Sequence, residues 1–288
     1  MIIGDDFIGK IYSKRNEDAK KYDHGSVFVI GGSQIYSGSP AITALSAMRA
    51  GADVAHIAAP ERSADIAASF SPDIITHPLK GVSLTLNHLP KLLEITESLK
   101  SASRGNLAVV IGGGMGRREE SKRLVREYVK NADVPIIIDA DGIYAFENDG
   151  EELLGENCLF TPHLYEFYIL TGRNIDNLSR DEKSKKVKES AAEMGIVIAL
   201  KGSEDVISDG SKVLINDLSV PELTAGGCGD TLAGIAGAIA SRKNDMLKAG
   251  AAACYINTRA GKIAANKYGE SLISEDLINS LPDAIKSF

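Results

Sequence analysis

Short apolar runs without polar interruption alternate with amphipathic stretches along most of the chain. Six of these runs have the length of strands, at 26–30, 53–58, 107–111, 135–139, 158–161 and 196–200. Because they lack polar alternation, each is expected to be buried on both faces, as in a mostly parallel sheet covered by helices. The pattern around Ile74 and Ile75 gives no clear prediction.

Helical patterns separate these runs and fill the C-terminal part of the chain. They predict helices at 39–50, 60–69, 117–130, 180–194, 228–241, 245–266 and 275–280. Thr161 and Pro162 would provide the N-cap and first residue of a further helix after the run at 158–161. The sequence SDGS separates the apolar stretches 206–207 and 213–215, which predicts a hairpin.

The alternation of strands and helices indicates an α/β fold with a mostly parallel central sheet and helices on both faces. No proline-rich or serine-rich linker, change of composition or internal repeat divides the chain, so residues 1–288 are expected to form one domain. In such sheets, ligands bind beyond the carboxyl ends of the strands, where the loops converge. The candidate motifs of this sequence all fall there.

Charge and cysteine usage narrow the class of protein. The 288 residues include 32 Lys and Arg against 39 Asp and Glu, a net charge of -7, which argues against binding to nucleic acid or an anionic membrane. The three cysteines lie far apart and form no disulfide framework or zinc pattern. The N-terminal residues lack the apolar core of a signal peptide, and no apolar run reaches about 18 residues. We therefore expect a soluble, cytoplasmic protein.

The segment 223–234, LTAGGCGDTLAG, is the most informative part of the sequence. Backbone N–H groups of Gly227, Cys228 and Gly229, at the start of a small-residue helix, form a potential anion site. Asp230 in the first helical turn could take a proton from a hydroxyl that attacks a bound phosphate. The alternative is a glycine-rich turn with an aspartate that stabilises only its own helix.

Two further glycine clusters follow predicted strands. One comprises Gly31, Gly32 and Ser33, with Gly38 and Ser39 shortly after, and the other spans 112–116. Neither is a Walker A loop or a G-x-G-x-x-G motif. Each could be an ordinary turn between strand and helix, or a place where a ligand approaches the backbone.

Polar residues at the same strand ends are candidates for ligand binding. Asp139 and Asp141 could bind Mg²⁺ or hydroxyl groups, although Asp141 could equally cap a helix. His163 and Glu166, three residues apart on one helical face, could hold a substrate. Lys201 follows the run at 196–200 and would place an ammonium at this edge, unless it is an ordinary surface lysine.

Taken in order, these segments resemble the NAD(P)H-hydrate dehydratase family of the ribokinase-like superfamily, from about His24 to Ala284. The resemblance lies in the segments HGSVFVIGGSQIYSGSP, VVIGGGMGR, IIIDADG, FTPHLYEF, IALKGSEDVISDG and AGGCGDTLAG. It implies a three-layer αβα sandwich. Gly31 runs into the helix at 39–50 within eight residues, which leaves no room for the β lid of sugar kinases.

The resemblance also implies roles for individual residues. Asp230 would be the base that activates the hydroxyl of the hydrated nicotinamide ring. The backbone amides of Gly227, Cys228 and Gly229 would bind the phosphate being transferred, and Lys201, Gly202, Ser203, Glu204 and Asp205 would lie along ADP or ATP. The hydrated dinucleotide would contact Ser39, Gly114 and His163, with Asp139, Asp141 and Glu166 nearby.

The reaction so implied is a nucleotide-dependent hydro-lyase reaction. Phosphorylation of the hydroxyl by ADP or ATP precedes elimination of phosphate, which regenerates NADH or NADPH, and Mg²⁺ screens the charge of the nucleotide. The family also implies a homotetramer. About 23 residues precede the match, too few for the epimerase domain that is fused to some relatives, so an epimerase is expected on a separate chain.

The sequence departs from the family pattern at three places. Cys228 stands where serine is common, Leu164 and Tyr165 replace a Pro-Gly pair, and the segment 216–223 lacks an Asn-x-Gly pattern. Two other functions compete with the dehydratase. One is a small-molecule kinase of the same fold for a vitamin precursor or sugar, since hydroxyethylthiazole kinases also carry cysteine in this loop. The other is a catalytically silent nucleotide-binding protein.

Overall fold

The computed structural model describes residues 1–12, 15–147, 155, 157–286 and 288. Within them one nine-stranded sheet has the order β3-β2-β1-β4-β5-β6-β7-β8-β9. Strands β1 to β7 are parallel, whereas β8 and β9 form the predicted antiparallel hairpin. The strands are β1 (Ser26–Ile30), β2 (Val54–Pro60), β3 (Ile74–Leu79), β4 (Leu107–Ile111), β5 (Ile136–Ile138), β6 (Cys158–Phe160), β7 (Val197–Leu200), β8 (Asp205–Ser208) and β9 (Val213–Asn216).

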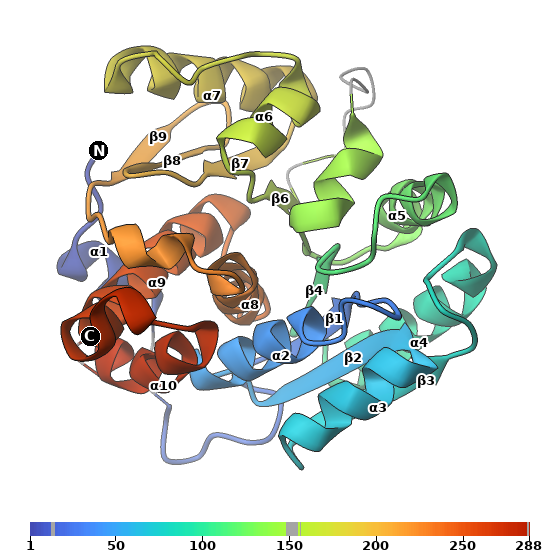
Figure 1. The fold of residues 1–288 in the computed structure, drawn as a ribbon. Helices are drawn as coiled ribbons and strands as arrows, with labels where there is room; N and C mark the ends of the chain where they lie inside the picture. The colour runs from blue at the N-terminus through green and yellow to red at the C-terminus, as the bar shows by residue number, and fades with distance from the viewer. Residues whose placement is uncertain (13–14, 148–154, 156, 287) are drawn as a thin grey trace.

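Helices cover both faces of this sheet and form two hydrophobic cores (Figure 1). Alternate residues of one strand face opposite cores: Val27 and Val29 point into the first, and Phe28 and Ile30 into the second. The first core is covered by α1 (Asp5–Ile11), α2 (Ser39–Arg49), α3 (Glu61–Phe70), α8 (Cys228–Ala240), α9 (Met246–Tyr268) and α10 (Ser274–Ile285). The second is covered by α4 (Leu89–Ala102), α5 (Glu119–Asn131), α6 (Leu164–Thr171) and α7 (Arg180–Met194). The expected α/β sandwich is therefore confirmed.

Three elements differ from the sequence-based expectations. The sequence analysis left α1 and α4 unassigned, and β3 lies at the sheet edge with a mixed burial pattern that obscures its period. The prediction that Thr161 caps a helix is wrong. The Thr161 N–H still donates to Ile138 in the sheet, whereas His163 caps α6 by accepting hydrogen bonds from two backbone N–H groups.

Helices α2 and α8 touch through their backbones. A Cβ atom at Gly234 of α8 would lie 2.2 Å from the carbonyl oxygen of Thr43 and 2.9 Å from the Cβ of Ser46, both in α2. Glycine at this position is thus what permits the contact. Because Ser39 begins α2 and Asp230 lies in the first turn of α8, the contact places these two residues at the same edge of the sheet.

Residues 31–38, between β1 and α2, contain no strand, so no β lid is inserted there. None of the helices in the described part of the chain is long and apolar enough to span a bilayer.

Candidate active site

The carboxyl ends of the parallel strands and the N-termini of three helices meet at one edge of the sheet. Strands β1, β4, β5, β6 and β7 run into the residues that the sequence singled out, while α2, α6 and α8 begin at this edge. Helix N-termini bring unpaired N–H groups and positive dipole ends to such a site. The edge is therefore suited to bind anions, as predicted.

The glycine loop after β4 lies against the neighbouring backbone. Gly112 has a φ of +127°, and a Cβ there would lie 2.1 Å from the carbonyl oxygen of Asp139. The carbonyl of Gly113 accepts a hydrogen bond of 2.8 Å from the N–H of Gly32, which joins the loops after β4 and β1. A side chain at Gly112 would push these loops away from the site.

Asp230 is paired with a hydroxyl at the mouth of α8. The Ser39 hydroxyl donates a hydrogen bond to its carboxylate, and a Cβ at Gly113 would lie 2.9 Å from the same oxygen. Burial raises the pKa of Asp230 to about 7, the hydrogen bond from Ser39 opposes this rise, and the charge of Asp139 adds to it. A carboxylate that titrates near neutral pH is well matched to general base catalysis.

Lys201 is not an ordinary surface lysine. Its ammonium donates a 2.8 Å hydrogen bond to Asp139 and lies 4.0 Å from Glu166. Burial favours the neutral amine, but the two carboxylates outweigh this and raise the pKa of Lys201 above its usual value. A Cβ at Gly229 would lie 3.3 Å from the Lys201 Nζ, so a stable cation faces the loop that was predicted to bind phosphate.

Asp139 orients this lysine through one of its carboxylate oxygens. The same carboxylate oxygen accepts the bond from Lys201 and a 2.7 Å bond from the Thr161 hydroxyl. With its side chain only 5% exposed, Asp139 is buried behind the lysine. These contacts are those of a residue that holds Lys201 in place, rather than of one that binds a substrate hydroxyl directly.

His163 and Glu166 form a reciprocal cap at the start of α6. The His163 Nδ1 accepts from the N–H groups of Tyr165 and Glu166, while the Glu166 carboxylate accepts a 3.0 Å bond from the His163 N–H. This pattern leaves the ring proton on Nε2. Burial lowers the pKa of His163, so the ring is neutral at pH 7 and presents an N–H donor.

Asp141 supports the glycine loop and does not cap a helix. Its carboxylate accepts hydrogen bonds of 2.9 Å from the N–H of Gly116 and from the Nε of Arg117. The guanidinium of Arg117 in turn lies over the ring of Tyr144, 3.7 Å from its centre. The interpretation of Asp141 as a cap is therefore wrong. Gly114 lies in the supported loop next to Ser39: a Cβ at Gly114 would be 3.3 Å from the Ser39 Cβ.

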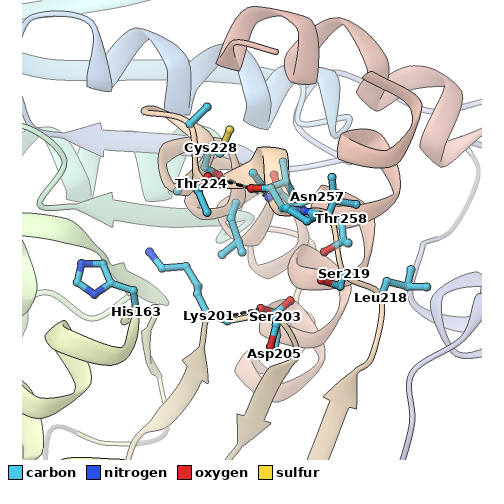
Figure 2. A pocket seen from close by; sticks show the side chains of 17 residues that line it. His163, Lys201, Ser203, Asp205, Leu218, Ser219, Thr224, Cys228, Asn257 and Thr258 are labelled. Atoms are coloured by element: carbon cyan, nitrogen blue, oxygen red, sulfur yellow. Dashed lines mark hydrogen bonds between the residues drawn. The ribbon is translucent and has the colours of Figure 1, made fainter. Parts of the chain in front are cut away.

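A cavity of about 590 Å³ opens beside this cluster (Figure 2). In Figure 2 the side chains of His163 and Lys201 come from one side, and those of Asn257 and Thr258 from the other. Of the residues predicted to lie along a nucleotide or its phosphate, the lining includes Lys201, Gly202, Ser203, Asp205, Cys228 and Gly229. Segments of the chain without any such prediction complete the wall, namely Leu218 to Pro221, Leu223 to Ala225, and Leu232.

Two predicted nucleotide residues do not line the cavity. Glu204 is paired with Arg180, whose Nε lies 2.7 Å from its carboxylate. Gly227 is the N-cap of α8 with a φ of +89°, so its part is to set the start of the helix. The predicted substrate residues Ser39, Gly114, Asp139, Asp141 and Glu166 also lie outside the cavity lining.

Buried polar side chains that the sequence analysis missed hold the cavity wall in place. Asn257 of α9 accepts a 2.7 Å hydrogen bond from Thr231 of α8. Asn216 donates 2.8 Å and 3.0 Å bonds to Asp205 and Thr258, and Asp205 also accepts from the Gly202 N–H. The sequence does carry a signal for Asn257 and Thr258, because these two adjacent polar residues interrupt the apolar face of a long predicted helix.

The described residues hold no group of three His, Cys, Asp or Glu placed to bind a metal ion. Mg²⁺ commonly binds through substrate phosphates, water and one or two carboxylates, and such an ion needs no protein cage. An ion bound to nucleotide phosphates would therefore need few ligands from this chain.

Comparisons with known proteins identify similar chains. The chain is 40% identical over its whole length to a bifunctional NAD(P)H-hydrate repair enzyme of Pyrobaculum aerophilum, of which it spans 56%. It is 38% identical, again over its whole length, to an ADP-dependent (S)-NAD(P)H-hydrate dehydratase of Cenarchaeum symbiosum, of which it covers 97%.

A solved structure and a family model extend the comparison to the fold. An ADP/ATP-dependent NAD(P)H-hydrate dehydratase of Bacillus subtilis, co-crystallised with ATP and Mg²⁺, superimposes with a TM-score of 0.79 at 22% identity, covering 97% of this chain and 95% of that one. The family model described as NAD(P)H-hydrate dehydratase matches residues 27–283. The chain therefore belongs to the NAD(P)H-hydrate dehydratase family, and its nine-stranded sandwich has the ribokinase-like fold.

Proposed function

We propose that the protein dehydrates (6S)-NADH or (6S)-NADPH hydrate at the expense of ADP or ATP, as a hydro-lyase. The observation that carries this proposal is the pairing of Asp230 with a hydroxyl beside the N-terminus of α8, next to the Lys201 ammonium. A base with a pKa of about 7, an anion site and a cation are the three parts that phosphoryl transfer to a hydroxyl requires.

The reaction proceeds in two chemical steps. Asp230 takes the proton of the hydroxyl on the hydrated ring, the oxygen attacks the terminal phosphorus, and the shortened nucleotide leaves. The ring carbon–oxygen bond then breaks, phosphate departs with the bonding electrons, and loss of a proton from the neighbouring carbon forms the double bond of the nicotinamide ring. Hydroxide leaves poorly and phosphate leaves well, which is why the nucleotide is consumed.

Backbone amides and Lys201 stabilise the charge of the transferred group. The N–H groups of Cys228 and Gly229 lie in the first turn of α8, where the helix itself provides no acceptor, although the Cys228 N–H donates a 3.3 Å bond to the carbonyl of Ala225 just before the helix. Since they are fixed before the reaction, they stabilise the charge without reorganisation. The nucleoside lies in the 590 Å³ cavity, against the apolar wall around Leu223.

Further parts of the assignment are proposals of the same kind. Mg²⁺ accompanies the nucleotide phosphates, and residues 1–288 act as one domain within a homotetramer. An epimerase supplies the S epimer, the form named for the Cenarchaeum relative. The cytoplasm is the proposed location, because pyridine dinucleotides and ADP or ATP are substrates there.

The test is recovery of reduced nicotinamide from hydrated NADH or NADPH, followed by absorbance with ADP or ATP present. Asp230→Asn is expected to lower kcat by about 10³ while nucleotide affinity stays within a few-fold, because only the base is lost. Asp283→Asn, an exposed carboxylate of α10, is the matched control. Retained turnover in Asp230→Asn would remove Asp230 from its role.

The same assay separates the competing functions. A kinase of this fold would accumulate a stable phosphoester of a thiazole or sugar alcohol and would not restore absorbance. A silent nucleotide-binding protein would bind ADP or ATP without turnover of either substrate. The charge of Lys201 acts on Asp230 at this site, which disfavours the silent protein, and the family membership disfavours the kinase.

A further inference from the structure

We propose that Ser39 is a positioning residue for the dehydration, which holds the Asp230 carboxylate toward Gly113 and ready to accept a proton. The inference rests on the proposed function, in which Asp230 is the base. It goes beyond contact with the substrate, because Ser39 would act through another side chain.

The Ser39 hydroxyl has the Asp230 carboxylate as its hydrogen-bond partner. Ser39 is the first residue of α2, and Pro40 behind it restricts the backbone. Its carbonyl accepts from the Thr43 hydroxyl at 3.1 Å, while its own hydroxyl donates to Asp230. A Cβ at Gly113 would lie 2.6 Å from this hydroxyl, so the absence of a side chain there makes room for the pair.

The backbone also fixes the distance between the two helices that carry the pair. Gly234 of α8 lies against the Thr43 carbonyl of α2, one turn after Ser39. The hydroxyl and the carboxylate are therefore brought together by helix packing, and neither depends on a mobile loop for its position.

The charges around Asp230 explain why a neutral donor matters. Asp139 beyond β5 and Asp141 beyond it repel a negative charge on Asp230, and Lys201 beyond β7 attracts one. Burial also disfavours the charged form of Asp230. The Ser39 hydroxyl donates to the ionised carboxylate and so counteracts the effect of burial on the pKa of Asp230. Without it, Asp230 would hold its proton to a higher pH and rotate more freely.

The experiment compares Ser39→Ala with Ser46→Ala. Ser46 lies in the same helix and donates only to the carbonyl of Ile42, so its substitution removes a hydroxyl without touching Asp230. The titration of Asp230 is followed by ¹³C carboxyl NMR, with the signal assigned by its loss in Asp230→Asn. The pH dependence of kcat/KM with hydrated NADH or NADPH is the second readout.

Ser39→Ala is expected to move both the NMR titration and the acid limb of kcat/KM upward by about one pH unit or more, because a hydrogen bond to a charged group is lost. Activity at pH 6 then falls about tenfold and largely recovers above pH 8.5. Ser46→Ala should titrate as the unsubstituted protein does.

The two readouts distinguish failure of the inference from failure of the proposed function. Unchanged titration and an unchanged acid limb in Ser39→Ala would overturn the positioning role, even in an active enzyme. A uniform loss of activity at every pH, with unchanged titration, would overturn it as well. A shifted titration in a protein that does not restore reduced nicotinamide would support the role of Ser39 and overturn the dehydratase.

Discussion

At the scale of single residues, burial and charge decide what the predicted side chains do. The sequence predicts Lys201, Asp139 and Glu166 at one edge, since the ends of parallel strands meet there. It does not show that Lys201 lies between the two carboxylates, because this depends on side-chain packing across three segments. The same holds for Arg117, whose partner Asp141 lies beyond the next strand of the sheet.

Gly229 and Gly226 provide a test of the phosphate loop at this scale. A Cβ at Gly229 would lie 3.3 Å from the Lys201 Nζ, whereas a Cβ at Gly226 meets nothing within 4 Å. We expect Gly229→Ala to raise the nucleotide KM about tenfold or more, because the methyl group enters the space between amide and ammonium. Gly226→Ala is the matched control. Equal KM values in steady-state kinetics would place the phosphate elsewhere.

At the scale of elements, strongly patterned segments were predictable, whereas the edge strand β3 was not. The bounds of α7 and β4 are those that the sequence predicts, since each combines a clear period with a clear end signal. The edge strand β3 is buried only at its two end residues and is exposed or half-buried between them, so it shows no continuous apolar run. Helix α6 begins later than predicted because Thr161 is used by the sheet and by Asp139.

A histidine pair joins the edge strand β3 to its neighbour β2. The Nδ1 of His56 lies 3.1 Å from the Nε2 of His77, and the rings stack. Burial lowers the pKa of His56 to about 4 and also lowers the pKa of His77. Both rings are neutral in the fold, whereas the unfolded chain protonates them below about pH 6.5.

The free energy of unfolding should therefore decrease as the pH is lowered below about 6.5. The decrease is at most about 1.4 kcal/mol per pH unit for each histidine. For His56 the fall continues to about pH 4. Urea unfolding between pH 7.5 and 5 measures it. The double variant His56→Gln/His77→Gln should lose less stability over this range than the unsubstituted protein. An equal loss in the double variant would exclude the pair as its source.

At the scale of the whole molecule, one continuous sheet joins the residues of the site. The sequence predicts a mostly parallel sheet, and the family resemblance implies the sandwich. Neither the periodicity nor the glycine motifs predict the strand order, because β1 pairs with β4 across about 80 residues and that pairing leaves no local pattern. The cavity wall at 218–225 was missed for the same reason, since it is brought to the site by the hairpin and α9.

A single sheet predicts a single unfolding transition. Thermal melts followed by far-UV circular dichroism and by near-UV tyrosine signals should coincide, because both hydrophobic cores lie on the same strands. ADP or ATP at about 100 times its Kd should raise the Tm by about 5 °C, as binding to the folded state adds about 2.7 kcal/mol. Two separated transitions, of which only one responds to nucleotide, would contradict the single domain.

Gly234 contacts no ligand in the proposed reaction, yet its packing affects the position of the proposed base. It lies one turn beyond Asp230 along α8, where the backbones of α8 and α2 touch. A methyl group added at this position would push α8 away from α2. The distance between the Asp230 carboxylate and the Ser39 hydroxyl, at the N-termini of these helices, would then increase. In the proposed reaction, the position of the base would thus depend on backbone packing in the protein interior, at a residue that has no side chain.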